Sequence, residues 1–221
     1  SWGLSTRSIG AIIMGHGDNR GIVMPPRIAP IKVILIEVLA NKNEKVKEIS
    51  KQILELLQNN NISSKIDNSN KSVGFKASQS EIEGIPIRIE IGPKEIEKNE
   101  VLVIRRDTLE KYPVQISNIL LFVNNLLEEI HNNLYKNSQK RLKENLVYCN
   151  SYEEFKKLIK QQKFVVVPIV KDSFKWEEKI KEETLATSRC ILVSNIFNIK
   201  EDKCIMTNEV TNNFVLFAKS Y

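Results

Sequence analysis

Apolar runs separated by amphipathic polar stretches predict strands that alternate with helices through the middle of the chain. Residues 33–39 are nearly all apolar, as expected of a strand covered on both faces. Residues 46–57 place apolar side chains three and four positions apart, which predicts a helix with one buried face. Further strands are expected at 65–67, 85–91 and 101–106, and a long helix at 116–146. This alternation favours an α/β layer with a mainly parallel or mixed sheet.

The section before residue 30 has shorter elements. The apolar run 10–14 is expected to be buried but is too short to assign as helix or strand, and 15–21 is predicted to be a turn-rich loop. A short strand is expected at 22–24. It stops at Pro25 and Pro26 because their rings cannot donate to a sheet.

The section after residue 146 repeats the alternation on a smaller scale. Ser151 and Glu154 have the spacing of a capping box and predict a helix that runs through Lys160. Strands are expected at 164–167, 190–193 and 213–218, with a helix at 176–184.

Composition places the chain among ordinary globular proteins. Its 221 residues are 42% hydrophobic and 27% charged, which excludes a disordered tail, a collagen-like fibre and a coiled-coil rod. No apolar run approaches the ~20 residues needed to span a bilayer, so we expect no membrane partner. The first residues resemble neither an initiator Met nor a signal peptide, and we expect the chain to derive from a longer protein.

Net charge and cysteine content add weak indications. The net charge of +6 is compatible with a nucleic-acid partner. Three scattered cysteines are too few for a disulfide framework and favour a reducing compartment, so we expect a cytoplasmic protein.

Two residues near the start could carry chemistry. Arg7 follows Gly3 at a spacing that would let a guanidinium meet a phosphate while the backbone approaches a nucleotide, although a surface arginine after a turn has the same pattern. His16 lies between glycines and close to Asp18, which could orient its imidazole for catalysis, although such a histidine often only satisfies loop backbone. The usual phosphate-loop, zinc-helix and nucleophile-turn motifs are absent from the sequence.

Basic residues gather at predicted strand ends in the middle section, namely Lys76, Arg88, Arg105 and Arg106. Within 85–91, Arg88 alternates with apolar residues and shares a face with Glu90, so we predict that this face meets either water or RNA.

Several segments, taken together, resemble one family. They are Ser-Trp-Gly-Leu-Ser-Thr-Arg at 1–7, His-Gly-Asp-Asn at 16–19 and Pro-Pro-Arg-Ile-Ala-Pro at 25–30. In this order they resemble the third class II motif of prolyl-tRNA synthetases of the archaeal and eukaryotic type. Segments 84–93 and 103–108 resemble the family's anticodon-binding domain, and 179–184 with 216–221 resemble its C-terminal zinc-binding-like domain.

The resemblance implies a mixed α/β and α+β fold in three parts. Residues 1–30 would end a class II antiparallel-sheet catalytic domain, 31–146 would form an α/β anticodon-binding domain with a mixed sheet, and 147–221 a small α/β zinc-binding-like domain. The first two class II motifs lie outside this sequence, so we expect the chain alone to be inactive and the homodimer contacts to lie upstream.

The implied activity is proline–tRNA ligation, in which ATP activates L-proline to prolyl-adenylate and the prolyl group passes to tRNA(Pro), with Mg²⁺ accompanying ATP. By similarity Arg7 would clamp the ATP phosphates as the catalytic arginine, and Ser5 would lie beside the nucleotide. The proline pocket would be bordered by Ser1, Trp2, Gly3 and His16. The anticodon would be bound by Lys76, Glu81, Arg88 and Arg106.

The C-terminal section departs from the family pattern at the metal ligands. The four positions that often carry cysteine are Val170, Trp176, Cys204 and Met206, so one thiolate remains. We therefore expect no structural zinc and apolar packing in its place. A second hypothesis for the whole chain is a synthetase-derived tRNA-binding module without catalysis, but retention of 1–7 favours the ligase.

Overall fold

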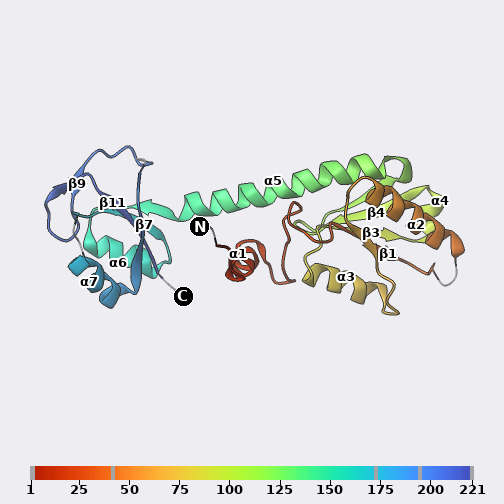
Figure 1. The fold of residues 1–221 in the computed structure, drawn as a ribbon, viewed down its shortest axis with the longest axis horizontal. Coiled ribbons are helices and arrows are strands. Elements are labelled where there is room, and N and C mark those ends of the chain that lie inside the picture. The colour runs from red at the N-terminus through yellow and green to blue at the C-terminus, as the bar shows by residue number, and fades with distance from the viewer. Residues whose placement is uncertain (1–2, 41–42, 172–173, 194–195, 220–221) are drawn as a thin grey trace. The chain divides into compact units, whose positions relative to one another are not determined.

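The structure is a computed structural model that describes residues 3–40, 43–171, 174–193 and 196–219 (Figure 1). It divides into two compact units, Ser1–Ser138 and Gln139–Tyr221. None of the helices in the described part is long and apolar enough to cross a membrane.

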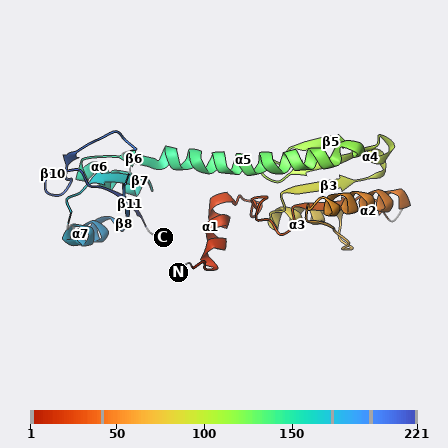
Figure 2. The same cartoon turned by 45° about the horizontal axis from the view of Figure 1, so that its top comes forward.

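The first unit is built on a five-stranded mixed sheet in the order β2-β1-β3-β4-β5 (Figures 1 and 2). The strands are β1 (Val33–Glu37), β2 (Ser64–Ile66), β3 (Ile87–Ile91), β4 (Glu100–Arg105) and β5 (Lys111–Gln115). The helices are α1 (Arg7–His16), α2 (Glu44–Asn59), α3 (Val73–Ile82) and α4 (Pro93–Glu97). Helix α5 (Ile119–Asn145) follows a 3-10 turn at Ile116–Asn118; it begins in this unit and its last residues belong to the second. Strand β1 pairs in parallel with β2 and β3, whereas β4 is antiparallel to β3 and β5.

Helices cover both faces of this sheet. Apolar side chains of α2 and α5 pack with every second residue of the strands, including Leu35 and Ile89, to form the main core. Helix α3 lies over the opposite face, where Arg88 of β3 donates to the Ala77 carbonyl at 3.3 Å. The expected strands at 33–39, 65–67 and 101–106, the helix at 46–57 and the long helix after 116 are confirmed with shifted ends.

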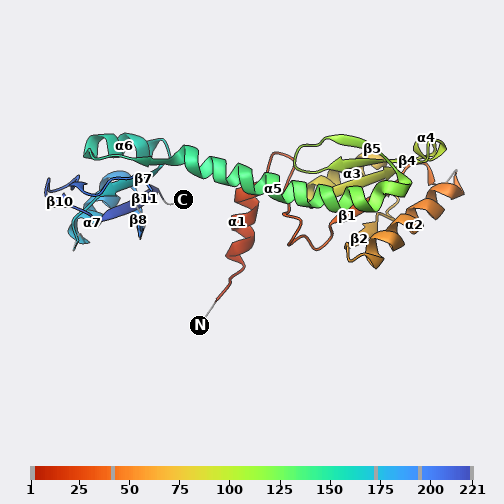
Figure 3. The ribbon, with the colours of Figure 1, turned by 90° about the horizontal axis from the view of Figure 1, so that it is seen from above.

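Three expectations for this unit are wrong. The charged face of the strand at 85–91 is covered: Arg88 is buried, because α3 and its acidic residues lie over that face. Residues 22–24 form no strand. The Met24 N–H donates to the Gly84 carbonyl instead of joining a ladder. The run 10–14 lies in helix α1, which buries none of its residues and stands apart from the sheet in Figures 2 and 3.

The second unit contains a four-stranded mixed sheet in the order β6-β7-β11-β8. Its strands are β6 (Leu146–Tyr148), β7 (Phe164–Pro168), β8 (Ala186–Ile191) and β11 (Phe214–Lys219), with a separate pair β9 (Asp202–Lys203) and β10 (Val210–Thr211). Helices α6 (Tyr152–Lys160) and α7 (Phe174–Thr184) contribute Phe155, Ile159 and Ile180 to a core with β7 and β11. The α/β class with mixed sheets is thus confirmed for both units.

Two details of this unit differ from the sequence predictions. Ser151 is the N-cap residue of α6, but its side chain makes no capping hydrogen bond, so the predicted capping box does not form. The strand expected at 190–193 begins earlier and ends earlier, as β8. It was predicted from Ile191, Leu192 and Val193, but Ile191 and Val193 are exposed.

Candidate functional site

A surface groove of about 520 Å³ opens where strands β1 and β2 end and helix α3 begins. Ligands of open α/β sheets commonly bind outside the carboxyl ends of parallel strands, where this groove lies. The Ser72 side chain caps α3 by accepting from the Phe75 N–H, and the first turn of a ten-residue helix favours a negatively charged group. The lining residues are Glu37, Leu39, Ala40, Asp67, Asn68, Ser69, Asn70, Lys71, Ser72, Val73 and Lys76.

Lys76 connects helix α3 with the segment after strand β2, and both line the groove. Its side chain is largely buried, and Nζ donates to the Asp67 carbonyl at 2.7 Å and lies 3.8 Å from the Asp67 carboxylate. Burial raises the pKa of Asp67, but hydrogen bonds from Ser69 and the charges of Lys76 and Lys65 outweigh it, so the pKa lies below its usual value. The groove therefore holds a fixed carboxylate and a fixed ammonium group.

An exposed aromatic ring stands beside the groove. Phe75 is 52% exposed, and the Lys71 ammonium lies 5.6 Å from its ring centroid. A neighbouring hollow of about 340 Å³ is lined by Phe75, Lys76 and Lys65, among others. An aromatic face with lysines around it and amide side chains nearby suits an unstacked nucleobase and its phosphates.

A partly buried ion-pair cluster lies on the side of α3 that faces the sheet. Glu81 accepts from Arg88 Nη1 at 3.0 Å and from Arg20 Nη1 at 2.9 Å, and Arg88 Nε donates to Glu90 at 2.9 Å. Burial raises the pKa of Glu81, but the two guanidinium groups lower it further than burial raises it. Glu81 is therefore held as an anion between two cations.

Arg106 joins this cluster to the N-terminal segment. Its Nη1 and Nη2 donate to the two carboxylate oxygens of Asp18, both at 2.7 Å, and Nε donates to the Glu81 carbonyl at 3.0 Å. Nη2 also donates to the Gly21 carbonyl at 3.2 Å. The Arg106 hydrogen bonds are the main reason that the pKa of Asp18 is lowered to about 2.

The four predicted anticodon residues thus fall into two groups. Lys76 lines the groove and binds Asp67 there, whereas Glu81, Arg88 and Arg106 belong to the ion-pair cluster on the other side of α3. A base contact at any of them stays a prediction. The sequence analysis missed Asn70 and Lys71, which line the groove. Asn70 and Lys71 stand between a predicted strand and Gly74, and that position was the available signal.

The predicted ATP and proline residues lie on or beside helix α1. Arg7 is its first residue and is exposed, Ser5 accepts from the Ser8 N–H at 3.0 Å, and His16 is its last residue and half-buried. Gly3 has open space where a side chain would begin. Ser1 and Trp2 lie outside the described residues.

The C-terminal unit keeps one thiol at the predicted metal positions. Burial raises the pKa of Cys204, but hydrogen bonds to its sulfur lower the pKa by more, so it lies below the usual value. The donors are the Thr207 hydroxyl and the N–H groups of Met206, Val170 and Thr207. Met206 packs against the core, and Val170 and Trp176 are half-buried. Across the described ranges, no three His, Cys, Asp or Glu side chains come together as a metal site would need.

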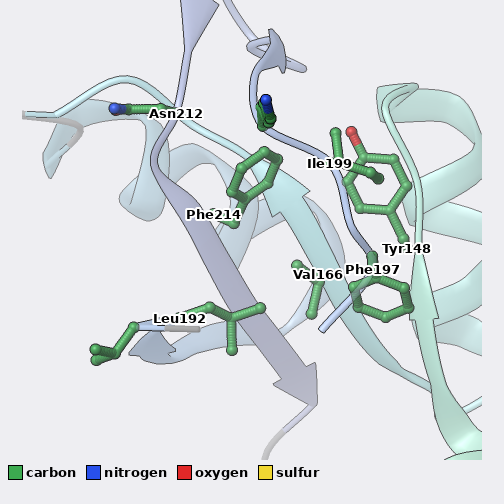
Figure 4. A pocket seen from close by; sticks show the side chains of 9 residues that line it. Tyr148, Val166, Leu192, Phe197, Ile199, Asn212 and Phe214 are labelled. Carbon is green, nitrogen blue, oxygen red and sulfur yellow. The ribbon is translucent and has the colours of Figure 1, made fainter. Parts of the chain in front are cut away.

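A second hollow, of about 220 Å³, lies in the C-terminal unit (Figure 4). Tyr148, Phe197 and Phe214 line it, and the Tyr148 hydroxyl donates to Asp202 at 2.6 Å. Burial and this carboxylate raise the pKa of Tyr148. The phenol is therefore a neutral part of the wall.

Comparison with known proteins matches two family descriptions. Residues 32–126 match "Anticodon binding domain" and residues 152–221 match "Prolyl-tRNA synthetase, C-terminal". The proline–tRNA ligases of Mycoplasmopsis synoviae and Mycoplasma mobile are 51% and 52% identical over all of this chain. The chain belongs to the prolyl-tRNA synthetase family. It spans about half the length of the curated relatives it matches, 47% and 46% for these two.

Solved synthetase structures agree with this assignment. The Cryptosporidium parvum prolyl-tRNA synthetase in complex with L-proline and AMP has a TM-score of 0.92 and 35% identity over the whole chain, which covers 47% of that protein. The structure of the same enzyme with halofuginone and AMPPNP has a TM-score of 0.92 and 36% identity to this chain, which covers 46% of that protein. The resemblance stated from the motifs is confirmed.

Proposed function

We propose that the protein containing this chain is a proline–tRNA ligase, which activates L-proline with ATP and transfers it to tRNA(Pro). One observation carries the proposal: proline–tRNA ligases match this chain over its entire length at 51% and 52% identity. The chain would supply the last catalytic motif and the tRNA-binding parts of that enzyme, and the remainder of the catalytic domain would lie upstream.

The first half-reaction needs a cationic donor at the α-phosphate, which helix α1 would supply. Attack of the proline carboxylate on the α-phosphate builds negative charge on phosphate oxygens, and fixed cationic donors stabilise that charge. Arg7 would serve as this donor, with Ser5 beside the nucleotide. Ser1, Trp2, Gly3 and His16 would border the proline. The exposed apolar side chains of α1, Ile9, Ile13 and Met14, support packing of this helix against an upstream part of the protein.

No residue of this chain is assigned to Mg²⁺. Within the ranges that the structure describes, carboxylates and histidines do not gather in threes. Mg²⁺ would accompany the ATP phosphates, to which it binds in many phosphate-transferring enzymes.

The groove beside α3 would receive unstacked anticodon bases. Phe75 offers a ring for stacking, Lys76 and Lys71 offer charge to the phosphates, and Asn70 offers an amide for base edges. Glu81, Arg88 and Arg106 would support α3 from its other side. The match of residues 32–126 to an anticodon-binding domain supports this placement.

We extend the proposal to domains, assembly and location. Residues 1–30 would close the class II catalytic domain, 31–146 would bind the anticodon, and 147–221 would form a zinc-binding-like domain without zinc. The enzyme would be a cytoplasmic homodimer through its upstream catalytic region.

The deciding experiment is proline-dependent ATP–pyrophosphate exchange on the full-length protein. Exchange with proline, and its loss in Arg7→Ala, would support the ligase and the place of Arg7 at the phosphates. Arg141→Ala is the matched control, because Arg141 is an exposed arginine of helix α5, outside the segments assigned to ATP and proline. A full-length protein that binds tRNA(Pro) but exchanges with no amino acid would overturn the proposal.

A further inference from the structure

The contact between Arg106 and Asp18 joins two parts of the first unit that are far apart in sequence. The Arg106 side chain is 2% exposed and binds both carboxylate oxygens of Asp18 in a fork. Such bidentate pairs fix orientation as well as distance. The position of the turn at 18–21 is therefore set by the end of strand β4, which Arg106 follows.

The same turn fixes the end of helix α1. The Gly17 N–H donates to Ile13 at 2.7 Å, and Asp18 and Gly21 exchange backbone hydrogen bonds at 2.9 and 3.2 Å. A side chain at Gly17 would start 2.5 Å from the Ile13 carbonyl, so the chain leaves the helix by a close backbone turn. A shift of Asp18 therefore moves the helix that begins at Arg7.

Helix α3 connects this cluster to the groove. Its residue Lys76 lines the groove. On the same helix, the Ala77 carbonyl and the Glu81 carboxylate accept hydrogen bonds from Arg88. The Glu81 carbonyl accepts one from Arg106. A ligand that displaces α3 from the groove side must also move the acceptors of these two guanidinium groups.

We propose that Arg106 and Asp18 are positioning residues that couple occupancy of the groove by the anticodon to the placement of helix α1 and Arg7. The inference rests on the proposed function and deepens it. It assigns Arg106 a role between the two sites and not a direct base contact. The coupling would make prolyl transfer sensitive to the anticodon.

The test compares Asp18→Asn and Arg106→Lys in the full-length enzyme, charging tRNA(Pro) and a tRNA(Pro) with a substituted anticodon. Arg106→Lys keeps the charge and loses the fork. We expect the ratio of kcat on tRNA(Pro) to kcat on the substituted tRNA to fall by about tenfold in these variants, within the usual range of coupling between sites.

Glu128→Gln is the matched control, because it neutralises the exposed carboxylate that pairs with Arg27, another link between the N-terminal segment and the rest of the unit. Asp18→Glu keeps a carboxylate and should restore part of the ratio. A ratio equal to that of the wild type in both variants, or equal losses of kcat on both tRNAs, would overturn the coupling and leave the ligase intact. Absence of proline charging by the wild type would overturn the proposed function and the coupling with it.

Discussion

Lys76 on helix α3 donates a hydrogen bond across 2.7 Å to the carbonyl oxygen of Asp67, one residue beyond strand β2. This bond closes the groove on one side and holds an ammonium group inside it. We expect Lys76→Met to raise the KM for tRNA by roughly tenfold, the equivalent of about 1.4 kcal/mol, and to leave proline-dependent exchange unchanged.

The measurement is aminoacylation against tRNA concentration at a fixed salt concentration. Lys51→Met is the control, because Lys51 is an exposed lysine of α2 that pairs with Glu55 and does not line the groove. Equal KM values for the two variants would contradict the placement of tRNA in the groove.

The pairing of Asp18 with Arg106 predicts a dependence of stability on pH. The pKa of Asp18 is lowered from 3.8 to about 2, so the unfolded chain takes up this proton first as the pH falls. The stabilisation by Asp18 is complete above about pH 4 and is lost as the pH falls through about 2. Urea unfolding should show the wild type more stable than Asp18→Asn at pH 7, with a smaller difference at pH 3 and least at pH 2. A constant difference would contradict the pairing.

The core of the second unit depends on Phe155. Its ring is fully buried and meets Phe217 edge-on, with 5.6 Å between centroids. We expect Phe155→Ala to lower the free energy of unfolding of this unit by about 3–5 kcal/mol, because the change leaves a cavity. Phe164→Ala removes a ring that is 39% exposed and should cost much less. Urea unfolding followed by circular dichroism would measure both, and equal losses would contradict the packing.

The three cysteines should differ in reactivity. Cys190 is exposed, whereas Cys149 and Cys204 are buried, and burial raises the pKa of Cys149 to about 12. Iodoacetamide at neutral pH should therefore modify Cys190 in the folded chain and all three thiols in urea. Mass spectrometry of the digested protein would identify the modified cysteines. Rapid native labelling of Cys149 would contradict its burial after strand β6.

Zinc should be absent from the purified full-length protein. Of the four positions that the family resemblance implies as metal ligands, only Cys204 holds a thiol, and Met206 packs on the core. A structural zinc site needs four ligands. Metal analysis should find no stoichiometric zinc, and a chelator should not lower the melting temperature. One zinc per chain would contradict this expectation.

The sequence predicts the strands and helices whose pattern comes from burial on a single core. Residues 33–39 and 46–57 are such cases, since their apolar spacing matches the sheet and helix that form. The strand at 85–91 misleads in one respect, because its charged residues alternate as if solvated. Arg88 is buried, and its charge is met by Glu81 and Glu90, which a single-strand pattern cannot show.

The site is less predictable than the fold for the same reason. The family resemblance implies Lys76 as an anticodon residue, and Lys76 lies in the groove, although its contact with tRNA is a proposal. Arg106 was expected at a base contact, but the sequence cannot reveal that Asp18 lies opposite it. That pairing depends on how the N-terminal segment returns to the sheet.

The distance in sequence between Asp18 and Arg106 has a consequence for synthesis on the ribosome. Asp18 leaves the ribosome 88 residues ahead of its partner. At ordinary elongation rates this gap lasts on the order of ten seconds, during which the turn and helix α1 have no β4 to bind. Arg106 can bind Asp18 only after strands β1 to β4 have been translated. The order of translation would then make a completed tRNA-binding sheet a precondition for the placement of Arg7.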